Sequence, residues 1–340
     1  MALSSPQTEQ QFMRLWQRRG VFACLLWPLS LLFGLVQWLR RRFYALGLFE
    51  RVVLPLPVIV VGNIFVGGTG KTPLVIWLVQ QLRAQGFTPG VLSRGYGGAA
   101  LSVQSVTAAT SPDQAGDEPV LIAQKTSAPL MVGRDRVAAA RALMAAHPEV
   151  DVIVADDGLQ HYRLARIIEI QLSDTRGVGN GWLLPAGPLR EPASRRSDFY
   201  VCNGAAASEP RSFRMQLDGA CAEQLLDRSR RIALSDLAPS KRVAALAGIG
   251  DPARFFAMLG AHGVRLSFTR GLPDHFDFSV NPFVDVDADL ILITEKDAVK
   301  CASIPAIAHD ARLWVVPVQA TIESTLAQHI VEKLRGHPTA

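Results

Sequence analysis

The sequence predicts an α/β protein with a mostly parallel sheet, and three observations support this class. Short apolar runs alternate with amphipathic stretches along the chain, which is typical of strands joined by crossover helices. A glycine-rich stretch lies between a run of β-branched residues and a predicted helix, at residues 58–73. A pair of carboxylates directly follows another apolar run, at residues 151–158. We therefore expect helices on both faces of the sheet and ligand contacts at the ends of its strands.

The stretch at residues 58–73, VIVVGNIFVGGTGKTP, has the order strand, glycine loop, Lys-Thr and helix. This is the P-loop arrangement, in which backbone N–H groups and the positive end of a helix bind phosphate oxygens. Lys71 is predicted to reach the β- and γ-phosphates of a nucleotide, and the Thr72 hydroxyl to bind Mg²⁺. The predicted nucleotide-binding residues are Gly67, Gly68, Thr69, Gly70, Lys71 and Thr72.

One position departs from the generic P-loop pattern. That pattern has glycine at position 65, where this chain has Phe65. We expect the Gly67-Gly68 pair to form the tight turn instead.

The composition is that of a folded intracellular protein. The chain has 340 residues, enough for two domains, and is 49% hydrophobic and only 19% charged, which argues against bulk disorder. Its four cysteines are scattered without a C-x-x-C pair. This pattern argues against a zinc site or a disulfide framework and suits a reducing cytosol.

The basic residues are concentrated around an apolar segment near the N-terminus. Residues 1–51 hold seven arginines and two acidic residues, a net charge of +5 that equals that of the whole chain. Within them, residues 21–39 are apolar over about one bilayer span. A nucleic-acid-binding enzyme more often carries its charge as a patch on the folded domain, so no nucleic-acid partner is expected.

Several interpretations of residues 21–39 compete. A cleaved signal peptide is disfavoured, because no small-residue cleavage site precedes the arginines at 40–42. A spanning helix is one alternative, and the positive-inside rule then places those arginines and the P-loop in the cytoplasm. A helix lying in the membrane interface is another. The non-membrane alternative is a helix packed on the protein's own core or on a second copy. We favour attachment to the cytoplasmic face of a membrane.

The apolar run at residues 151–158, DVIVADDG, ends in Asp156 and Asp157. In P-loop proteins an Asp at such a strand end holds Mg²⁺ directly or through water. Gln160 and His161 follow on the same loop and are expected to line the same cleft. A long Gly/Pro loop at residues 177–192 is a further candidate for function, because such loops in compact domains often carry contacts.

Asp117 and Glu118 open a predicted helix that extends to about residue 125. The pair either stabilises the helix dipole or takes part in chemistry, and local sequence leaves both alternatives open. If the protein is a kinase, it needs a base for the acceptor hydroxyl. Asp117 and His275 are the candidates, although most single histidines are not catalytic.

The chain is predicted to divide into an N-terminal membrane-associating segment, a P-loop domain and a smaller α/β lobe. The expected boundaries are 1–51 for the segment, 52–228 for the P-loop domain, 229–240 for a polar linker and 241–340 for the second lobe.

Two motifs in the second lobe resemble nucleotide-binding elements but depart from them. The turn with Gly248 and Gly250 has neither G-x-G-x-x-G nor a Lys-Ser/Thr pair, so we interpret it as structural. The stretch TEKD at 294–297 has the wrong order for the element that recognises guanine, so GTP is not inferred. Lys296 and Lys300 are expected to serve the structure or to bind an anionic group.

The ordered motifs between about residues 58 and 300 resemble the tetraacyldisaccharide 4′-kinase family, the lipid A 4′-kinases. The motifs are GNIFVGGTGKTP, LSRGYGG, GDEP, VGRDR, DDGLQH, LPAGPLREP, PDHF and TEKDAVK. The hydrophobic N-terminus is also similar to that family's membrane-attaching segment, and Phe65 is part of the family's own pattern. The resemblance implies transfer of the ATP γ-phosphate, with Mg²⁺, to the 4′-hydroxyl of a tetraacylated glucosamine disaccharide 1-phosphate. It further implies a monomer at the cytoplasmic face of the bacterial inner membrane.

The resemblance also implies residue roles. Asp117 matches the family's catalytic base and His275 its partner, with Lys71 acting on the donor phosphates. The positions that match sites near Mg²⁺ are Thr72, Glu118, Asp156 and Asp157. The expected substrate contacts are Tyr96, Arg136, Gln160, His161 and Arg190.

A membrane-associated P-loop NTPase switch or metallochaperone is the alternative from another functional class. A switch that uses GTP would carry a guanine-recognition motif, and a metallochaperone a Cys/His cluster. The sequence has neither, so the kinase is preferred.

Overall fold

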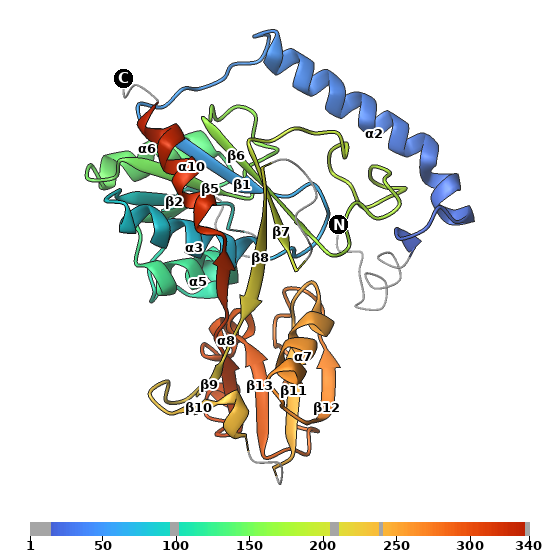
Figure 1. Cartoon of the computed structure of the whole chain (residues 1–340), viewed down its shortest axis with the longest axis vertical. Helices are drawn as coiled ribbons and strands as arrows, with labels where there is room; N and C mark the ends of the chain where they lie inside the picture. Colours follow the sequence, from blue (N-terminus) through green and yellow to red (C-terminus); the bar gives the residue numbers. More distant parts are fainter. Residues whose placement is uncertain (1–14, 96–101, 205–210, 238–240, 337–340) are drawn as a thin grey trace.

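A computed structural model of the chain describes residues 15–95, 102–204, 211–237 and 241–336 and contains two sheets, one in each lobe (Figure 1). The first sheet has nine strands in the order β15-β8-β7-β6-β1-β5-β2-β4-β3. The second has six strands in the order β10-β9-β14-β13-β11-β12. The strands at the centre of each sheet are parallel, and antiparallel strands lie toward the edges. The predicted α/β class is therefore confirmed.

The first sheet places the P-loop strand β1 (Val58–Gly62) between β5 (Val152–Asp156) and β6 (Ile168–Asp174). All five residues of β1 are buried, as expected for a parallel strand covered on both faces. The other strands are β2 (Pro89–Ser93), β3 (Gln104–Ser105), β4 (Leu130–Val132), β7 (Phe199–Asn203), β8 (Ser212–Asp218) and β15 (Gln319–Ile322).

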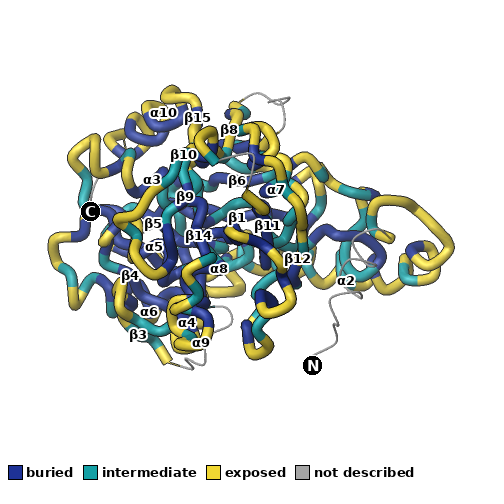
Figure 2. The backbone as a smooth tube through the Cα atoms, turned by 90° about the horizontal axis from the view of Figure 1, so that it is seen from below, coloured by how far each residue is buried: buried dark blue, intermediate teal, exposed yellow. Residues whose placement is uncertain are grey.

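Helices cover both faces of this sheet, and alternate residues of β1 point to each face. Ile59 and Val61 pack against α3 (Lys71–Ala84), α5 (Asp117–Thr126) and α10 (Ser324–Arg335). Val58 and Val60 face the opposite side, which α6 (Arg136–Ala146) covers. The period of two along the strand produces this division. The short helix α4 (Pro112–Ala115) directly precedes α5. Figure 2 shows the resulting buried centre of the molecule.

The second lobe repeats this arrangement on a smaller scale. Its parallel strands are β11 (Val243–Ala247), β12 (Leu266–Gly271), β13 (Leu290–Thr294) and β14 (Leu313–Val316), and its antiparallel strands are β9 (Cys221–Gln224) and β10 (Arg231–Ala233). The helical elements are η1 (Leu234–Asp236), α7 (Pro252–Ala261), α8 (Glu295–Cys301) and α9 (Pro305–Ala308). Val299 of α8 packs into the core of the first lobe, so the two lobes share apolar contact.

The structure corrects the predicted boundaries of the second lobe. Part of the expected linker at 229–240 forms β10, which pairs with β9 in the second sheet. The C-terminal β15 and α10 return to the first sheet, where Ala320 pairs with Leu217 of β8. Two antiparallel strands therefore carry the chain out of the first lobe and back, as Figure 1 shows. Local sequence gives no sign of this return, because a strand and helix at the C-terminus fit either lobe equally well.

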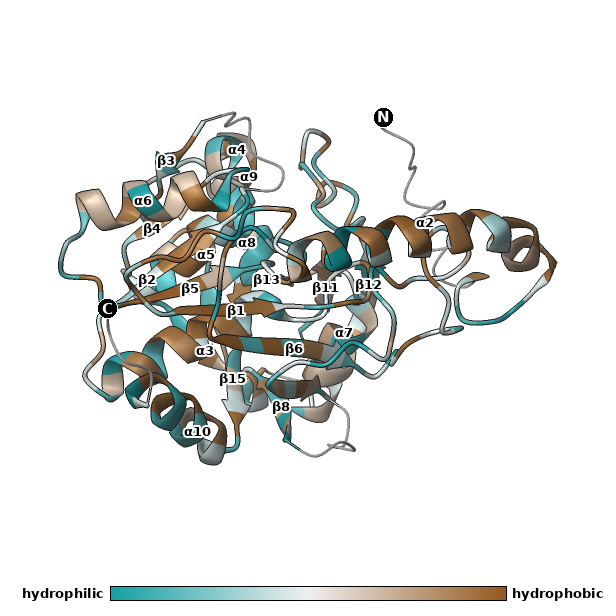
Figure 3. Cartoon of the chain, turned by 90° about the horizontal axis from the view of Figure 1, so that it is seen from above, coloured by the Kyte–Doolittle hydropathy of each residue, from teal (hydrophilic) through white to brown (hydrophobic). Residues whose placement is uncertain are grey.

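The apolar N-terminal segment forms α2 (Val21–Ala45), a helix of 25 residues. By length and composition alone it is long and apolar enough to cross a membrane, and only 11% of its most apolar window is buried. Figure 3 shows it as a mainly hydrophobic helix that extends away from the sheets. This exposure contradicts the alternative in which the helix packs into the protein's own core.

Helix α2 touches the rest of the described chain mainly through the loop at 177–189. The Ser30 hydroxyl donates to the Leu183 carbonyl, and Trp27 lies 6.2 Å from the Trp182 ring. Just before the helix, Trp16 Nε1 donates to the Pro185 carbonyl at 2.9 Å. The predicted Gly/Pro loop therefore contacts both the helix and the residues just before it.

Truncating the core of α10 should destabilise the sheet that carries the P-loop. Ile330 is fully buried in the same cluster as Ile59 of β1, so Ile330→Ala should cost about 2–5 kcal/mol of unfolding free energy. We expect hydrogen–deuterium exchange to increase in β1. The control Gln328→Ala changes an exposed residue of the same helix. An increase in hydrogen–deuterium exchange that is confined to β11 and β13 would assign α10 to the second lobe and contradict the prediction.

Candidate active site

The P-loop joins β1 to α3 at the carboxyl end of the central strand of the first sheet. Gly67 and Gly70 have φ values of 94° and 97°, in the left-handed region that glycine adopts without a Cβ clash. Lys71 is the first residue of α3, so the free N–H groups of that helix terminus lie next to the loop. The geometry is that of a phosphate-binding loop, although Phe65 replaces the glycine of the generic pattern.

The carboxylates of β5 lie beside this loop because β5 pairs with β1. Val61 is opposite Asp156 in the parallel register. Lys71 Nζ lies 3.5 Å from Asp157 Oδ1 and 3.4 Å from Asn63 Oδ1. The predicted phosphate-binding lysine is thus oriented by an acid and an amide, one from each strand end.

Asp156 is a buried carboxylate with unsatisfied hydrogen-bonding capacity. Its side chain is 1% exposed; Oδ2 accepts from Ser93 Oγ at 3.1 Å, and Oδ1 has no partner in the described part of the chain. Burial and the nearby Glu118 carboxylate raise the pKa of Asp156 to about 7, against the lowering effect of Lys71. A cation at this place would satisfy Oδ1 and offset the negative charge.

These residues fit Mg²⁺ bound partly by phosphate oxygens and water. Within the described ranges, no group of three or more His, Cys, Asp or Glu side chains is arranged to hold a metal alone. Mg²⁺ in nucleotide sites commonly uses one or two carboxylates, with phosphates and water completing the shell. Asp156 Oδ1 is the carboxylate oxygen best placed to bind Mg²⁺ here. The other residues that the sequence predicts near Mg²⁺ are Thr72, Glu118 and Asp157.

Asp117 and His275 are in contact across the two lobes. Asp117 is the first residue of α5, and His275 lies on the loop after β12. His275 Nδ1 is 3.1 Å from Asp117 Oδ2 and 3.2 Å from Oδ1. The Asp117 side chain is 1% exposed and that of His275 is 25% exposed. Two residues separated by 158 positions therefore form one pair, in which the carboxylate is buried and the imidazole is partly exposed.

Lys300 of α8 also binds Asp117. Its Nζ lies 2.8 Å from Asp117 Oδ2 and donates to the Phe276 carbonyl at 2.9 Å. Burial favours the neutral carboxyl, but the hydrogen bond with His275 and the positive charges of Lys296 and Lys300 outweigh it, so the pKa of Asp117 lies well below its ordinary value. Asp117 is therefore an ionised hydrogen-bond acceptor at neutral pH.

The contact with Lys296 determines which ring nitrogen of His275 accepts a hydrogen bond. Lys296 Nζ lies 3.3 Å from His275 Nε2, 2.9 Å from Asp274 Oδ1 and 3.3 Å from Glu118 Oε1. An ammonium group donates hydrogen bonds and accepts none, so Nε2 must be the acceptor in this contact. The ring proton then sits on Nδ1, where it faces Asp117.

Asp157 and His275 share an uncommon backbone conformation. Their φ values are 49° and 59°, in the left-handed region where residues with a Cβ are infrequent. Such conformations persist only where surrounding structure holds them, and they concentrate at functional sites. Here Asp157 contacts Lys71 and Arg190, and His275 contacts Asp117.

Two of the expected substrate contacts are Tyr96 and Arg136. Tyr96 lies outside the described residues. Arg136 is 2% exposed, and its guanidinium donates to the main-chain carbonyls of Ser93, Gly133 and Asp156. These bonds hold the Arg136 guanidinium at the carboxyl ends of neighbouring strands. The expected direct contact of Arg136 with substrate stays a prediction.

Of the remaining expected substrate residues, Arg190 contacts Asp157, and Gln160 and His161 follow Asp157 in the chain. Arg190 Nη1 lies 3.4 Å from Asp157 Oδ1, and Gln160 Nε2 donates to Glu191 Oε1 at 2.8 Å. Burial and then the positive charges of Arg136 and Arg94 lower the pKa of His161 to about 4. Burial disfavours either charge, whereas the positive charges of Arg136 and Arg94 would favour an anion near His161.

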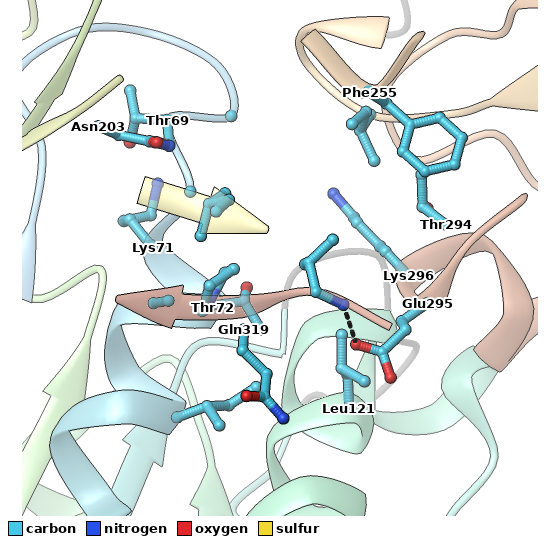
Figure 4. A pocket seen from close by; sticks show the side chains of 18 of the residues that line it. Thr69, Lys71, Thr72, Leu121, Asn203, Phe255, Thr294, Glu295, Lys296 and Gln319 are labelled. Carbon is cyan, nitrogen blue, oxygen red and sulfur yellow. Dashed lines mark hydrogen bonds between the residues drawn. The ribbon is translucent and has the colours of Figure 1, made fainter. Parts of the chain in front are cut away.

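A cavity of about 310 Å³ opens between the P-loop and the second lobe (Figure 4). Lys71 and Thr72 line it from the P-loop side, and Lys296 and Phe255 from the second lobe. The other lining side chains are both apolar, among them Ile76, Trp77 and Leu121, and polar, among them Gln80 and Gln319. The cavity therefore has a phosphate-binding end and a remainder of mixed apolar and polar character.

Sequence reasoning missed several residues of the site. Asp274 has a local signal, because it directly precedes His275. For Lys296 and Lys300 the sequence predicts only a structural role or the binding of an anionic group, not their contacts with His275 and Asp117. Asn63 and Asn203 had no distinctive signal, since a polar residue after a strand is common.

Comparisons with known proteins identify relatives over the whole chain. The family model described as tetraacyldisaccharide-1-P 4′-kinase matches residues 22–335. A tetraacyldisaccharide 4′-kinase of Janthinobacterium sp. (strain Marseille) is 56% identical, with all of both chains covered. That of Herminiimonas arsenicoxydans is 54% identical, covering 100% of this chain and 99% of the relative.

A solved structure has the same fold. It is described as the "apo" form of LpxK from Aquifex aeolicus in complex with ATP, and it matches with a TM-score of 0.75 and 27% sequence identity. The match covers 92% of this chain and 100% of that one.

His161 should remain neutral well below its usual titration range. With its pKa near 4 in the folded protein and about 6.5 when unfolded, the unfolded state binds more protons between these values. His161 then contributes stability above about pH 6.5, and this contribution is lost as the pH falls toward 4. NMR titration of the ring C–H signals tests this. A His161 midpoint near 6.5 would contradict the prediction.

Proposed function

The chain belongs to the tetraacyldisaccharide-1-P 4′-kinase family, an ATP-dependent phosphotransferase family of lipid A biosynthesis, and we propose that Asp117 is its catalytic base. The observation that carries this assignment is the contact of Asp117 with His275 and Lys300, next to Glu118 and Lys296, which line the P-loop cavity. It gives an ionised, oriented carboxylate next to the place where the donor phosphates bind.

The proposed reaction is an in-line transfer between ATP and a lipid acceptor. The 4′-hydroxyl oxygen of the tetraacylated disaccharide 1-phosphate forms a bond to the γ-phosphorus, and the bond from that phosphorus to the β–γ bridging oxygen breaks. ADP leaves with that oxygen, and the hydroxyl proton passes to Asp117. Little covalent help is needed, because such transfers depend on placement and charge neutralisation.

The donor is held by the P-loop side of the cavity. The N–H groups of residues 67–72 and the Lys71 ammonium bind the phosphates, and the rest of the cavity, with its mixed apolar and polar lining, receives the nucleoside. Mg²⁺, held by Asp156 with Thr72, Glu118 and Asp157 nearby, neutralises phosphate charge when bound. Asp157 keeps Lys71 in place through the contact at 3.5 Å.

The acceptor side uses the second lobe and the loops around Asp157. His275 orients Asp117 through Nδ1–H, and Lys300 binds the same carboxylate at Oδ2. Gln160, His161 and Arg190 contact the sugar or its 1-phosphate, while Arg136 supports the loops from below.

Helix α2 brings the enzyme to its acceptor. The acyl chains leave a bilayer at a cost of about 0.8 kcal/mol per CH₂ group, so the active site must come to the membrane. The exposed apolar face of α2 and its flanking arginines suit the cytoplasmic face of the inner membrane. A monomer suffices, because both halves of the described site come from one chain.

Purified protein with Mg²⁺-ATP should phosphorylate the disaccharide 1-phosphate in mixed micelles. Asp117→Asn should reduce kcat by about 100-fold or more, the usual contribution of a general base, while the Kd for ATP changes little. Asp113→Asn, an exposed acid four residues away, is the matched control. ATP hydrolysis indifferent to the lipid would favour an NTPase switch, and normal turnover in Asp117→Asn would exclude Asp117 as the base.

Lys300→Met should lower kcat about tenfold, because a buried carboxylate loses a charge-assisted hydrogen bond. The KM for ATP should remain near the wild-type value, since Lys300 does not line the donor end of the cavity. Lys333→Met removes a partly exposed lysine from its ion pair with Asp198 and serves as the control. An equal fall in kcat for both variants would argue against a specific role of Lys300.

A further inference from the structure

Side chains hold a series of P-loop carbonyl groups. Asn63 Nδ2 donates to the Phe65 carbonyl at 2.7 Å and to that of Gly67 at 3.3 Å. Arg176 Nη2 donates to the Gly68 carbonyl at 2.8 Å. Asn203 Nδ2 donates to that of Thr69 at 2.9 Å.

This arrangement determines which way the loop's peptide groups face. A carbonyl oxygen turned toward a phosphate would repel it, whereas an N–H group attracts it. Within the described residues, the N–H groups of Gly67, Gly68, Thr69 and Gly70 donate to no protein acceptor. The carbonyls are occupied and the N–H groups are available, as an anion-binding loop requires.

Arg176 is the only charged residue among these carbonyl donors, and it lies on Phe65. Its guanidinium carbon is 4.6 Å from the centre of the Phe65 ring, within the range of a cation–π contact. Glycine at position 65 could not supply such a surface. The departure from the generic P-loop pattern therefore has a physical use: the phenyl ring supports the arginine that holds the next part of the loop.

Asp174 fixes the other side of the guanidinium. Arg176 Nε and Nη2 lie 3.1 Å and 2.6 Å from Asp174 Oδ1 and Oδ2, and the Asp174 side chain is 1% exposed. Such a bidentate contact needs the planar fork of arginine, which lysine lacks.

The second lobe reaches the same cluster. Arg254 Nη2 of α7 lies 3.5 Å from Asp174 Oδ2. In addition, a Cβ placed on Gly250 would come within 2.7 Å of the Gly68 nitrogen. The turn with Gly248 and Gly250, which the sequence presents as structural, thus packs directly on the P-loop.

We propose that Arg176, supported by Phe65 and Asp174, is a positioning residue for the donor phosphates: by holding the Gly68 carbonyl outward, it keeps the loop's N–H groups directed at the nucleotide. This inference rests on the proposed donor site. Arg176 acts through the loop backbone and not through the phosphates themselves. Its removal should therefore weaken ATP binding without changing the acceptor's contacts.

The test compares Arg176→Lys and Phe65→Leu with a matched pair elsewhere in the chain. Arg270 lies 5.0 Å from the Phe268 ring and binds Asp285 with two nitrogens. It repeats the same side-chain arrangement on β12, away from the P-loop. The controls are Arg270→Lys and Phe268→Leu. Calorimetry of Mg²⁺-ATP binding and steady-state kinetics are measured for all variants.

Arg176→Lys should raise the Kd and KM for ATP by about tenfold, as expected for loss of a charge-assisted hydrogen bond, and leave the KM for the lipid unchanged. Phe65→Leu should raise the Kd and KM for ATP by roughly threefold. The double variant should bind ATP only slightly more weakly than Arg176→Lys, because the ring acts through the arginine. The controls should match wild type. Phe65→Leu keeps an apolar side chain in a buried position, so it tests the idea even if Arg176→Lys does not fold.

Two results would overturn the inference. One is an unchanged ATP affinity in both variants, with only a lower Tm, which would make Arg176 a purely structural residue. The other is an equal loss in the Arg270→Lys control. Either result leaves the proposed function intact if wild-type protein still transfers phosphate to the lipid. Absence of ATP binding and transfer in wild type would instead refute the proposed function.

Discussion

The buried contact between Asp117 and His275 links the two lobes, and much of the active-site structure depends on it. Asp117 comes from the layer of helices on the first sheet, and His275 from a loop of the second lobe. A carboxylate with 1% exposure is costly to ionise without a partner. His275 and Lys300 supply that compensation only when the lobes are together, so the proposed base is assembled by lobe contact.

Compensation by a nearby partner also applies to the other charges around the P-loop. Lys71 is placed between Asn63 and Asp157, and Arg176 between the Gly68 carbonyl and Asp174. Each buried charge has an opposite charge or a dipole next to it. Asp156 still has one carboxylate oxygen unsatisfied in the described chain, and Arg176 has one unsatisfied nitrogen, Nη1. The unsatisfied Asp156 oxygen suits a site completed by Mg²⁺ and phosphate.

The loop at 177–190 connects the membrane-associating helix to this chemistry. At one end it carries the carbonyls of Leu183 and Pro185, which accept from Ser30 and Trp16. At the other, Arg190 binds Asp157 beside the P-loop lysine. A single ordered loop therefore lies between the helix that meets the lipid and the residues that handle phosphate.

The sequence by itself determined the α/β class, the strand–loop–helix at residues 58–73, the carboxylates after β5 and the apolar helix near the N-terminus. These features depend on local periodicity, glycine placement and composition, which are visible over ten to twenty residues. The resemblance to a kinase family also predicted the pairing of Asp117 with His275. Only the tertiary structure decided that α10 returns to the first sheet, that Arg136 is committed to backbone carbonyls, and that Arg176 lies on Phe65. These are contacts between distant segments, and their energies depend on burial and geometry that local sequence does not encode.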